Sequence, residues 1–367
     1  MKVCTVVGTR PEIIKLSRVM AELDRTAEHI VIHTGQNYDY ELNEIFFKEM
    51  GIRKPDFVLA GASQSTTAIS AVANMMVQIE QVLESVKPDA ILILGDTNSC
   101  VAAAYAAKRL KIPVFHMEAG NRCFDERVPE EVNRRIVDQL SDINMPYSDL
   151  ARENLMREGF PTDRVIKTGS PMNEVLQHYQ QDIWASMVLQ RMGLNEKQYF
   201  VVSCHREENV DSPEKFKQLC DLLNVLADKY HERIIVSSHP RVRSKFTTWG
   251  DFRNEVEFHK PLGFFDYVKL QKHAHCTLSD SGTITEESSL ESFPALNLRE
   301  AHERPEGMEE ASVIMTGFNV DRVLESIDVA QDAMCTPNDY CSMQVSKKVV
   351  RIVLSYVDYV NCKVWHR

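Results

Sequence analysis

The chain lacks several features that would assign it to a particular class of protein. It has no unbroken apolar run of about 18 residues, so no membrane span is expected. Its nine cysteines form no CxxC pair, which predicts reduced thiols in the cytoplasm, most of them in the core. The 42 basic residues against 53 acidic ones give a net charge of -11, which argues against a nucleic-acid partner. Local basic groups would therefore have to hold any anionic ligand.

Two common site motifs are missing as well. The first predicted strand-helix turn has only Gly8 before Thr9-Arg10-Pro11, so it fails the GxGxxG pattern and does not predict tightly bound NAD. The run His273-Ala274-His275-Cys276 resembles a metal cluster, but no second ligand pair accompanies it at a suitable spacing. No metal is therefore expected. The N-terminus, MKVCTVVGTRPEII, is typical of a first core strand rather than a signal peptide.

What the chain does have is a regular alternation of strand-length apolar runs and helix-length amphipathic segments. This pattern predicts an α/β fold with parallel sheets covered by helices, and 367 residues suit two domains. The predicted strands are Val3–Val7, Ile30–His33, Ala90–Leu94, Pro113–Met117 and Ile143–Pro146, then Phe200–Ser203, Arg233–Ser237, Val256–Phe258, Cys276–Ser279 and Ala295–Leu298.

The domain boundary is predicted near Thr168-Gly169-Ser170-Pro171, where a short strand over residues 164–167 runs into turn residues. The first domain would span residues 1–170 and the second 171–345. A polar helix from Asn173 to about Met192 would lead into the second domain. The last segment, residues 346–367, would begin with a helix and pack back on the first domain.

Charged residues gather where the predicted strands end. In open parallel sheets ligands bind beyond the carboxyl ends of the strands, so these positions are candidate site residues. Taken singly, each of them is better explained by turn chemistry or a solvated ion pair than by a site. Their recurrence at successive strand ends favours a site. The bases could meet a pyrophosphate, and the acids, with the raised pKa expected of half-buried carboxyl groups, could transfer protons. The bases are Arg10, Lys15, His205 and Arg206, and the acids are Asp96, Glu118 and Glu131.

The stretch Asp280-Ser281-Gly282-Thr283 precedes a predicted helix and is a candidate phosphate site. Free N–H groups and the helix dipole favour an anion there, although the same residues suit an ordinary N-cap. Glu286 and Glu287 follow within one turn, where they could accept hydrogen bonds from ribose or simply complement the dipole.

Seven stretches in this order resemble the non-hydrolysing UDP-N-acetylglucosamine 2-epimerase family: GTRPEIIK, GDTNS, HMEAGNR, PEEVNRR, CHREEN, SDSGTITEE and ERPE. The resemblance implies the GT-B fold, in which two Rossmann-like domains face each other across a deep cleft. It also implies an isomerase that removes the proton at carbon 2, expels UDP to leave a 2-acetamido glycal and adds both back with inversion. This chemistry needs no added cofactor. Family members are commonly homodimers, so a homodimer is expected.

The resemblance assigns roles residue by residue. The catalytic set would be Lys15, Asp96, Glu118, Glu131 and His205. The UDP contacts would be Ser281, Gly282 and Glu287, with Arg10, Arg206 and Arg304 as further cations. Which carboxylate removes the proton and which returns it is left open.

Within the family, the loop Asn121-Arg122-Cys123-Phe124-Asp125 resembles the subgroup that forms UDP-N-acetyl-L-fucosamine from UDP-N-acetyl-L-talosamine for capsules and O-antigens. This loop would set the specificity for the sugar. Gln36-Asn37 stands where the glucosamine branch has Gln-His, so activation by a second substrate molecule is doubtful. The alternatives are a UDP-N-acetylglucosamine/UDP-N-acetylmannosamine epimerase, a GT-B glycosyltransferase, and a UDP-sugar binding protein without activity.

Overall fold

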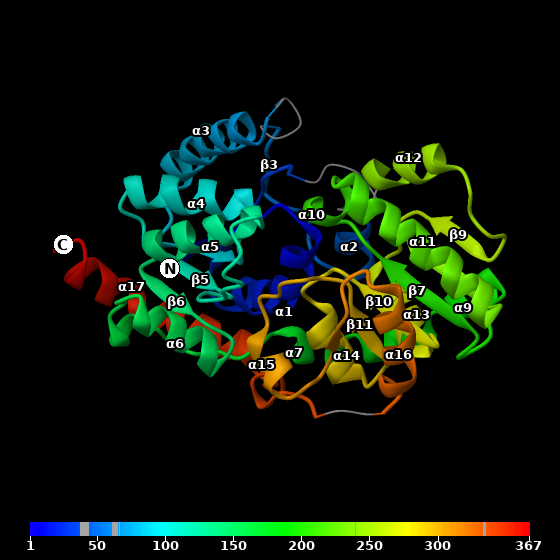
Figure 1. The fold of residues 1–367 in the computed structure, drawn as a ribbon. Helices are drawn as coiled ribbons and strands as arrows, with labels where there is room; N and C mark the ends of the chain where they lie inside the picture. The colour runs from blue at the N-terminus through cyan, green and yellow to red at the C-terminus, as the bar shows by residue number, and fades with distance from the viewer. Residues whose placement is uncertain (37–43, 61–64, 66, 239, 333–334) are drawn as a thin grey trace. The chain divides into compact units, whose positions relative to one another are not determined.

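The computed structural model describes residues 1–36, 44–60, 65, 67–238, 240–332 and 335–367. The chain divides into two compact units (Figure 1). Unit 1 comprises Met1–His178 and Asn338–Arg367, and unit 2 comprises Tyr179–Pro337. Each unit has its own sheet and its own hydrophobic core.

Unit 1 contains a six-stranded sheet in the order β3-β2-β1-β4-β5-β6, in which all pairs are parallel. Its strands are β1 (Lys2–Val7), β2 (Glu28–His33), β3 (Phe57–Val58), β4 (Ala90–Leu94), β5 (Val114–Met117) and β6 (Ile143–Met145). Its helices are α1 (Arg10–Thr26), α2 (Glu44–Glu49), α3 (Ala68–Val86), α4 (Asn98–Arg109), α5 (Pro129–Leu140), α6 (Asp149–Arg157), α7 (Met172–His178) and α17 (Val345–Lys363), with the 3-10 turns η2 (Thr162–Arg164) and η3 (Asn338–Tyr340).

Unit 2 contains a second parallel sheet of six strands, in the order β12-β11-β10-β7-β8-β9. Its strands are β7 (Tyr199–Ser203), β8 (Arg233–Ser237), β9 (Val256–His259), β10 (Cys276–Ser279), β11 (Ala295–Asn297) and β12 (Ile314–Met315). Its helices are α8 (Gln180–Ala185), α9 (Val188–Met192), α10 (Glu207–Val210), α11 (Pro213–Tyr230), α12 (Pro240–Trp249), α13 (Phe264–His273), α14 (Ile284–Glu291), α15 (Pro305–Glu309) and α16 (Val320–Val329).

Both sheets have the same topology. Counted from the first strand of each unit, the order is 3-2-1-4-5-6, the order of the Rossmann fold. The central strands are apolar throughout because both faces of each sheet are covered; every residue of Ala90–Leu94, for example, is buried. The predicted α/β class with two Rossmann-like parallel sheets is confirmed, and all ten predicted strands are present.

This topology fixes where a ligand can approach each sheet. The strand order reverses between β1 and β4 in unit 1 and between β7 and β10 in unit 2. At such a point the loops after the two strands diverge and leave a crevice at the carboxyl edge. The loops after β1 and β4, and those after β7 and β10, are therefore the ones that position a site.

Two local predictions were wrong. The segment 164–167 is not a strand, because the 3-10 turn Thr162–Arg164 occupies its start and only Val165 forms a bridge, to Asn144. The helix predicted from Asn173 to Met192 is three short helices, α7, α8 and α9. Part of the reason is Ser186, whose hydroxyl accepts a hydrogen bond from the Val188 amide at 3.2 Å and competes with helix continuation.

The edges of the sheets and the unit boundaries also differ from prediction. The strands β3 and β12 were missed because two residues are too few to show a period. The chain divides after His178 and Pro337, whereas the division was predicted after residues 170 and 345. The turn at Gly169-Ser170 lies inside unit 1, since the Ser170 amide donates to the Asp339 carbonyl at 3.0 Å.

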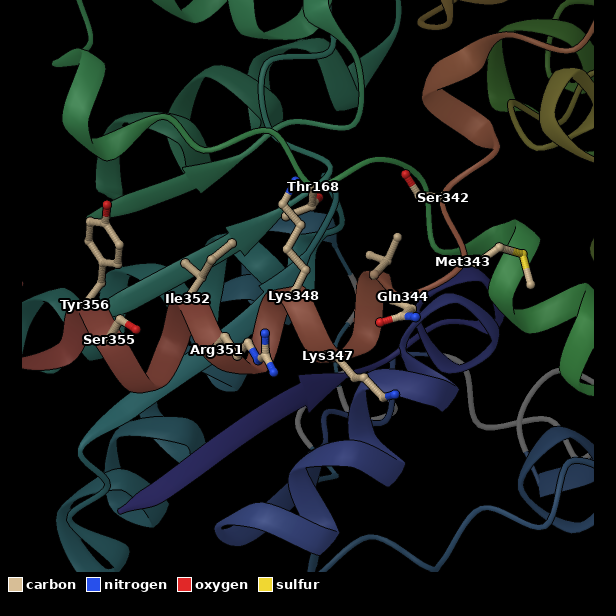
Figure 2. Close-up of a pocket in the computed structure, with 11 residues that line it drawn as sticks. Thr168, Ser342, Met343, Gln344, Lys347, Lys348, Arg351, Ile352, Ser355 and Tyr356 are labelled. Carbon is tan, nitrogen blue, oxygen red and sulfur yellow. The ribbon is translucent and has the colours of Figure 1, made fainter.

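The C-terminal helix α17 packs against α1 within unit 1. A cavity of about 490 Å³ lies beside it, and its lining includes Thr168, before α7, and Lys348, Ile352 and Tyr356 of α17 (Figure 2). Figure 2 shows Lys348 extending towards Thr168, whereas Lys347 and Arg351 extend from another side of α17. Within the described part of the chain, no helix is long and apolar enough to cross a membrane.

Candidate active site

In unit 1 the turn from β1 into α1 is organised by Glu12. One carboxylate oxygen accepts hydrogen bonds from the Gly8 amide at 2.7 Å, the Thr9 amide at 2.7 Å and the Thr9 hydroxyl at 3.0 Å. Glu12 is the third residue of the helix, so it reaches back to the N-terminal amides as the glutamate of a capping box does. The turn after β1 is thereby fixed by its own sequence.

The other oxygen of Glu12 connects this turn to the loop after β4. It accepts from the Thr97 hydroxyl at 2.7 Å and from the Cys100 thiol at 3.3 Å. Glu12 is 1% exposed, and burial raises its pKa although the hydrogen bonds from Thr97, Gly8, Cys100 and Thr9 oppose the rise. Glu12, Gly8, Thr9, Thr97 and Cys100 are called the Glu12 cluster below.

Gly8 must be a glycine at this place. A Cβ there would lie 2.2 Å from the Thr34 hydroxyl oxygen and 2.3 Å from that of Ser99. The Ser99 hydroxyl and amide donate to the Gln36 side chain at 2.7 and 3.1 Å, which links the loops after β2 and β4. The pair Gln36-Asn37, which stands where the glucosamine branch has Gln-His, belongs to the loop after β2. Its second residue, Asn37, lies outside the described residues.

Lys15 and Glu118 form a buried ion pair at this edge of the sheet. The Lys15 ammonium lies 2.6 Å from a Glu118 oxygen, and the two side chains are 2% and 11% exposed. The ammonium also lies 5.6 Å from the centre of the Tyr147 ring. This ion pair holds the Glu118 carboxylate directly after β5.

Glu118 has an unusual backbone conformation. Its φ of 65° lies in the left-handed region, which costs a residue with a side chain about 1–3 kcal/mol. Strain of this kind persists where the surrounding structure holds a side chain in place, and it gathers at functional sites. The strained turn after β5 therefore marks Glu118 as a carboxylate that the fold of unit 1 holds in a defined position.

Asp96 and Glu131 are joined by Arg134. Its Nε donates to Asp96 at 2.7 Å and its NH1 to Glu131 at 2.8 Å. Arg134 is 3% exposed and lies three residues after Glu131 in α5, so the two side chains share one helix face. The structure thus brings two of the predicted acids together through a base that was not among the predicted site residues.

The expectation of a raised pKa was wrong for Glu131. Burial alone would raise its pKa, but hydrogen bonds from the Cys123 amide and thiol and from Arg134 hold the pKa below its usual value. The Phe124 amide and Arg135 also contact this carboxylate, both at 3.3 Å. With both oxygens occupied and 0% exposure, Glu131 in this conformation organises the loop.

The loop Asn121–Asp125 separates into a buried and an open part. Arg122 is 2% exposed and pairs with Asp138 at 2.8 Å and with Glu158 at 2.6 Å, which ties the loop to α5 and α6. Asn121 is also buried. Phe124, with a φ of 55°, is 73% exposed, and Cys123 and Asp125 are half-buried. Only the latter three present surface that a ligand could touch.

Arg10 is the first residue of α1 and is half-buried. Among the described residues it forms no hydrogen bond or ion pair with another described group. A cation without a partner at the start of a helix, beside the point where the strand order reverses, is suited to an anionic ligand.

In unit 2 the corresponding place is organised by Asp280, directly after β10. Its carboxylate accepts from the amides of His205 at 3.0 Å and Arg206 at 2.9 Å, which follow β7. It also accepts from the Cys204 thiol at 3.0 Å and from the Asn209 side chain at 3.1 Å. These five residues are called the Asp280 cluster below.

Asp280 also pairs with the ring of His205. The Nδ1 atom lies 3.2 Å from an Asp280 oxygen, and Asp280 is 0% exposed. Burial would raise the pKa of Asp280, but the charge of His205 and the hydrogen bonds from Cys204, Arg206 and Asn209 lower it. A carboxylate beside Nδ1 favours the tautomer that carries its proton there, and it orients the ring.

Ser281 and Gly282 lie between β10 and α14. The Ser281 hydroxyl shares a hydrogen bond with the Thr283 hydroxyl at 3.0 Å, and both residues are half-buried. A Cβ at Gly282 would lie 2.4 Å from a Glu303 oxygen, and the same oxygen lies 3.1 Å from the Arg206 guanidinium. Arg206 is therefore beside the start of α14, as a cation for an anion at this helix end would be.

The remaining predicted contacts of unit 2 are more deeply buried. The Glu287 carboxylate accepts from the Gln271 amide at 3.0 Å, and Glu287 is 9% exposed. Arg304 is 3% exposed and lies 3.3 Å from Glu286. Both side chains are held by neighbours within unit 2.

Four residues hold the predicted ones in place, and the sequence interpretation did not assign this role to them: Glu12, Arg134, Asp280 and Glu303. The spacing Thr9-x-x-Glu12 is a capping-box signal and could have identified Glu12. The spacing of three residues between Glu131 and Arg134 could have identified that pair. Asp280 has no comparable local signal, because its partners are distant in the sequence. Glu303 pairs with Arg299, four residues before it, and with the distant Arg206.

Comparison with known proteins identifies the family of the chain. The family model described as UDP-N-acetylglucosamine 2-epimerase matches residues 21–354. The chain belongs to this family, whose members are isomerases. This epimerase-family chain aligns over 100% of its length with 100% of a solved UDP-N-acetylglucosamine 2-epimerase from Rickettsia bellii, at 48% identity and a TM-score of 0.91.

Two further relatives of this epimerase-family chain are informative. The Methanocaldococcus jannaschii UDP-GlcNAc 2-epimerase, solved in complex with UDP-GlcNAc and UDP, is 30% identical over 97% of this chain and 100% of that one, with a TM-score of 0.91. The UDP-2,3-diacetamido-2,3-dideoxy-D-glucuronate 2-epimerase of Pseudomonas aeruginosa is 32% identical over 89% of this chain and 91% of that protein. The epimerase family and the two-sheet fold are thus established.

Proposed function

We propose that this epimerase interconverts UDP-N-acetyl-L-talosamine and UDP-N-acetyl-L-fucosamine. The observation that carries the choice of sugar is the loop Asn121–Asp125, which resembles the L-fucosamine subgroup and presents Cys123, Phe124 and Asp125 at its open part. The relative named for a diacetamido-glucuronate is compatible with a sugar other than N-acetylglucosamine. A role in capsule or O-antigen biosynthesis follows from this substrate.

The nucleotide is assigned to unit 2. Ser281 and Gly282 at the start of α14 would receive a phosphate oxygen, and Arg206 would add a charge-assisted hydrogen bond. Glu287 would accept hydrogen bonds from ribose, and Arg304 would neutralise charge nearby. In unit 1, Arg10 would supply a further cation to the pyrophosphate.

Proton transfer is assigned to Glu118. The Lys15 ammonium holds its carboxylate at 2.6 Å, and a carboxylate can take the proton from carbon 2 as a general base. As that proton leaves, the electron pair of the C2–H bond forms the C1=C2 double bond, and the C1–O bond breaks with its electrons passing to UDP. The product pair is a 2-acetamido glycal and UDP.

The return step reverses these changes on the other face of the sugar. A protonated group gives a proton to carbon 2, the double bond opens, and a UDP oxygen re-forms the bond to carbon 1. Asp96, Glu131 and His205 are the candidates for this acid. His205 is a candidate because Asp280 lies 3.2 Å from its Nδ1 atom and orients the ring.

Isotope exchange with three UDP-sugars tests this proposal. Incubation in heavy water should place deuterium at carbon 2 of UDP-N-acetyl-L-fucosamine faster than at carbon 2 of UDP-N-acetylglucosamine. The second candidate function, UDP-N-acetylglucosamine 2-epimerase, is favoured by the solved relative that holds UDP-GlcNAc. If only UDP-N-acetylglucosamine and UDP-N-acetylmannosamine exchanged, the result would favour the glucosamine epimerase and contradict the proposed L-fucosamine epimerase. Permanent transfer of the sugar to an acceptor, without exchange, would indicate a glycosyltransferase.

A further inference from the structure

Four charged side chains of unit 1 form an unbroken row of ion pairs. The Arg122 guanidinium donates to both oxygens of Glu158, at 2.8 and 2.6 Å, and its NH1 atom lies 2.8 Å from one Asp138 oxygen. The other Asp138 oxygen lies 3.0 Å from Nδ1 of His116. Arg122, Asp138 and His116 are each at most 2% exposed, whereas Glu158 ends the row near the surface. The row is called the Arg122–His116 chain below.

The ring of His116 lies between two acceptors. Its Nε2 atom is 2.8 Å from the Gly95 carbonyl oxygen, which can only accept a hydrogen bond, so Nε2 carries a proton. Its Nδ1 atom faces the Asp138 carboxylate, which favours a proton on that nitrogen as well. The geometry is therefore that of an imidazolium. No step of the proposed proton transfer uses this ring, although it lies only two residues before Glu118.

At one end the chain holds the turn after β4. Gly95 directly precedes Asp96 and has a φ of 81°, in the left-handed region. Its amide donates to the Met117 carbonyl at 3.0 Å and its carbonyl accepts from His116, so both polar groups of its backbone are bound to β5. The orientation of the peptide group between Gly95 and Asp96 therefore depends on the His116 ring.

In its middle the chain holds the turn after β5. The Asp138 carboxylate accepts from the Gly120 amide, with its two oxygens at 3.3 and 3.2 Å. Gly120 lies two residues after Glu118 and is tightly enclosed, since a Cβ there would lie 2.2 Å from the Ala151 carbonyl oxygen. Glu118 has the strained φ of 65°, which persists only where such contacts hold the turn. One buried chain thus contacts the turns of two predicted catalytic acids.

We propose that His116 and Asp138 are positioning residues that set the place of Asp96 relative to Glu118 for the epimerase reaction. This inference rests on the proposed function, in which both acids belong to the catalytic set. Catalytic groups have to be held within about 0.5 Å of the productive geometry by neighbours that are themselves locked. The chain meets this requirement, because neither His116 nor Asp138 can move away without leaving a charge unpaired in the interior. Both residues act through the backbone turns and need no contact with the sugar.

Substitution of His116 tests the positioning role. His116→Gln keeps a donor for the Gly95 carbonyl but removes the charge, whereas His116→Leu removes both. The kcat for carbon 2 exchange should fall by about 10-fold in the first and about 100-fold in the second, while KM and UDP affinity stay within about 2-fold. Normal kcat in both variants would overturn the proposal.

His29→Gln is the matched control. His29 is also a buried histidine of unit 1, and its ring lies between the Asp24 carboxylate at 2.6 Å and the Thr5 hydroxyl at 2.8 Å. It lies near the start of β2, at the end of the sheet opposite the carboxyl edge. Loss of its charge and contacts should leave kcat unchanged. Circular dichroism and urea unfolding verify that each variant is folded under the assay conditions, so that a loss of stability alone does not lower kcat.

A double-mutant cycle separates one connected chain from two independent contacts. If His116 and Asp138 act as a unit, His116→Gln combined with Asp138→Asn should lower kcat no further than Asp138→Asn alone. Losses in kcat that multiply would reject the chain.

Nitrogen-15 NMR of the wild type tests the chain without any substitution. Both ring nitrogens of His116 should have the chemical shift of a protonated nitrogen at neutral pH, and a ring nitrogen without a proton would overturn the chain. The exchange assay separates the two proposals. A wild type that exchanges no UDP-sugar would refute the proposed function and the positioning role with it, whereas exchange by the wild type with normal kcat in both His116 variants would refute the positioning role alone.

Discussion

In both units a buried carboxylate holds the loops where the strand order reverses, but the two carboxylates differ in their ion pairing. In each unit a buried carboxylate accepts two consecutive backbone amides and one thiol where the strand order reverses: Glu12 in unit 1 and Asp280 in unit 2. Glu12 forms no ion pair with a described residue and its pKa is raised, whereas Asp280 pairs with His205 and its pKa is lowered.

This difference indicates which residues hold the loops and which take part in proton transfer in each unit. In unit 1 the turn is held by Glu12, and the ion pair for chemistry is a separate one, Lys15 with Glu118. In unit 2 Asp280 does both: it holds the turn and it orients His205. Substitutions should therefore separate structure from chemistry in unit 1 and affect both together in unit 2.

The largest effect is expected for Asp280→Asn. The amide presents an N–H₂ group to four donors and removes the charge that pairs with His205, so the free energy of unfolding should fall by about 3 kcal/mol or more. Carbon 2 exchange should fall with it, by about 100-fold. Urea unfolding and the exchange assay measure the two. Asp228→Asn, a surface aspartate of unit 2 that pairs with Arg253, should change neither. Full activity in Asp280→Asn would remove His205 from the mechanism.

A smaller effect is expected for Glu12→Gln. Its raised pKa means that the folded protein already tolerates the uncharged form, and glutamine keeps one oxygen for the Gly8 and Thr9 amides. The loss should be about 1–2 kcal/mol in the free energy of unfolding, with exchange activity near normal. Glu22→Gln on the same helix serves as the control. A Glu12→Gln variant with normal stability but no exchange would reverse the assignment of roles.

The smallest effect is a difference in pH dependence. The lowered pKa of Asp280 means that its stabilising contribution is complete above the ordinary aspartate pKa of about 3.9 and is lost as the pH falls through its lowered pKa. The raised pKa of Glu12 means that its contribution is complete below the ordinary glutamate pKa of about 4.3 and is lost as the pH rises through its raised pKa.

Stability curves of the two variants against pH measure this difference. Compared with wild type, Asp280→Asn should show a weaker loss of stability on acidification. Glu12→Gln should lack the component that declines as the pH rises above the ordinary glutamate value. If the stability of both variants changed with pH in parallel with that of the wild type, neither carboxylate would have a shifted pKa in the folded protein.

Much of this arrangement could be predicted from the sequence because strand ends in a parallel sheet share one edge. That rule alone placed Arg10 and Glu118 at the edge of unit 1, and His205 and Ser281 at that of unit 2. What it could not give was the protonation behaviour. The pKa of Glu131 was expected to be raised and is lowered, because the amide of Cys123 and the guanidinium of Arg134 reach it only in the folded loop.

The connections between distant segments were also beyond the sequence. Thr97 lies 85 residues from Glu12, and His205 lies 75 residues from Asp280, so no local spacing pairs them. The same holds near helix ends: the Ser186 hydroxyl, which accepts from the Val188 amide, also donates to Asp266 in α13, 80 residues away. Local periodicity finds strands and helices, whereas side-chain partners across the sheet decide how the site is held.

The central claim is that Glu118 transfers the carbon 2 proton while unit 2 holds the nucleotide. The most direct test is the rate of deuterium exchange at carbon 2 in Glu118→Gln, measured beside UDP affinity by calorimetry, with Glu153→Gln on α6 as the control. Exchange should fall by about 100-fold or more, and UDP should bind as tightly as to the wild type. Near-normal exchange in Glu118→Gln would contradict the claim.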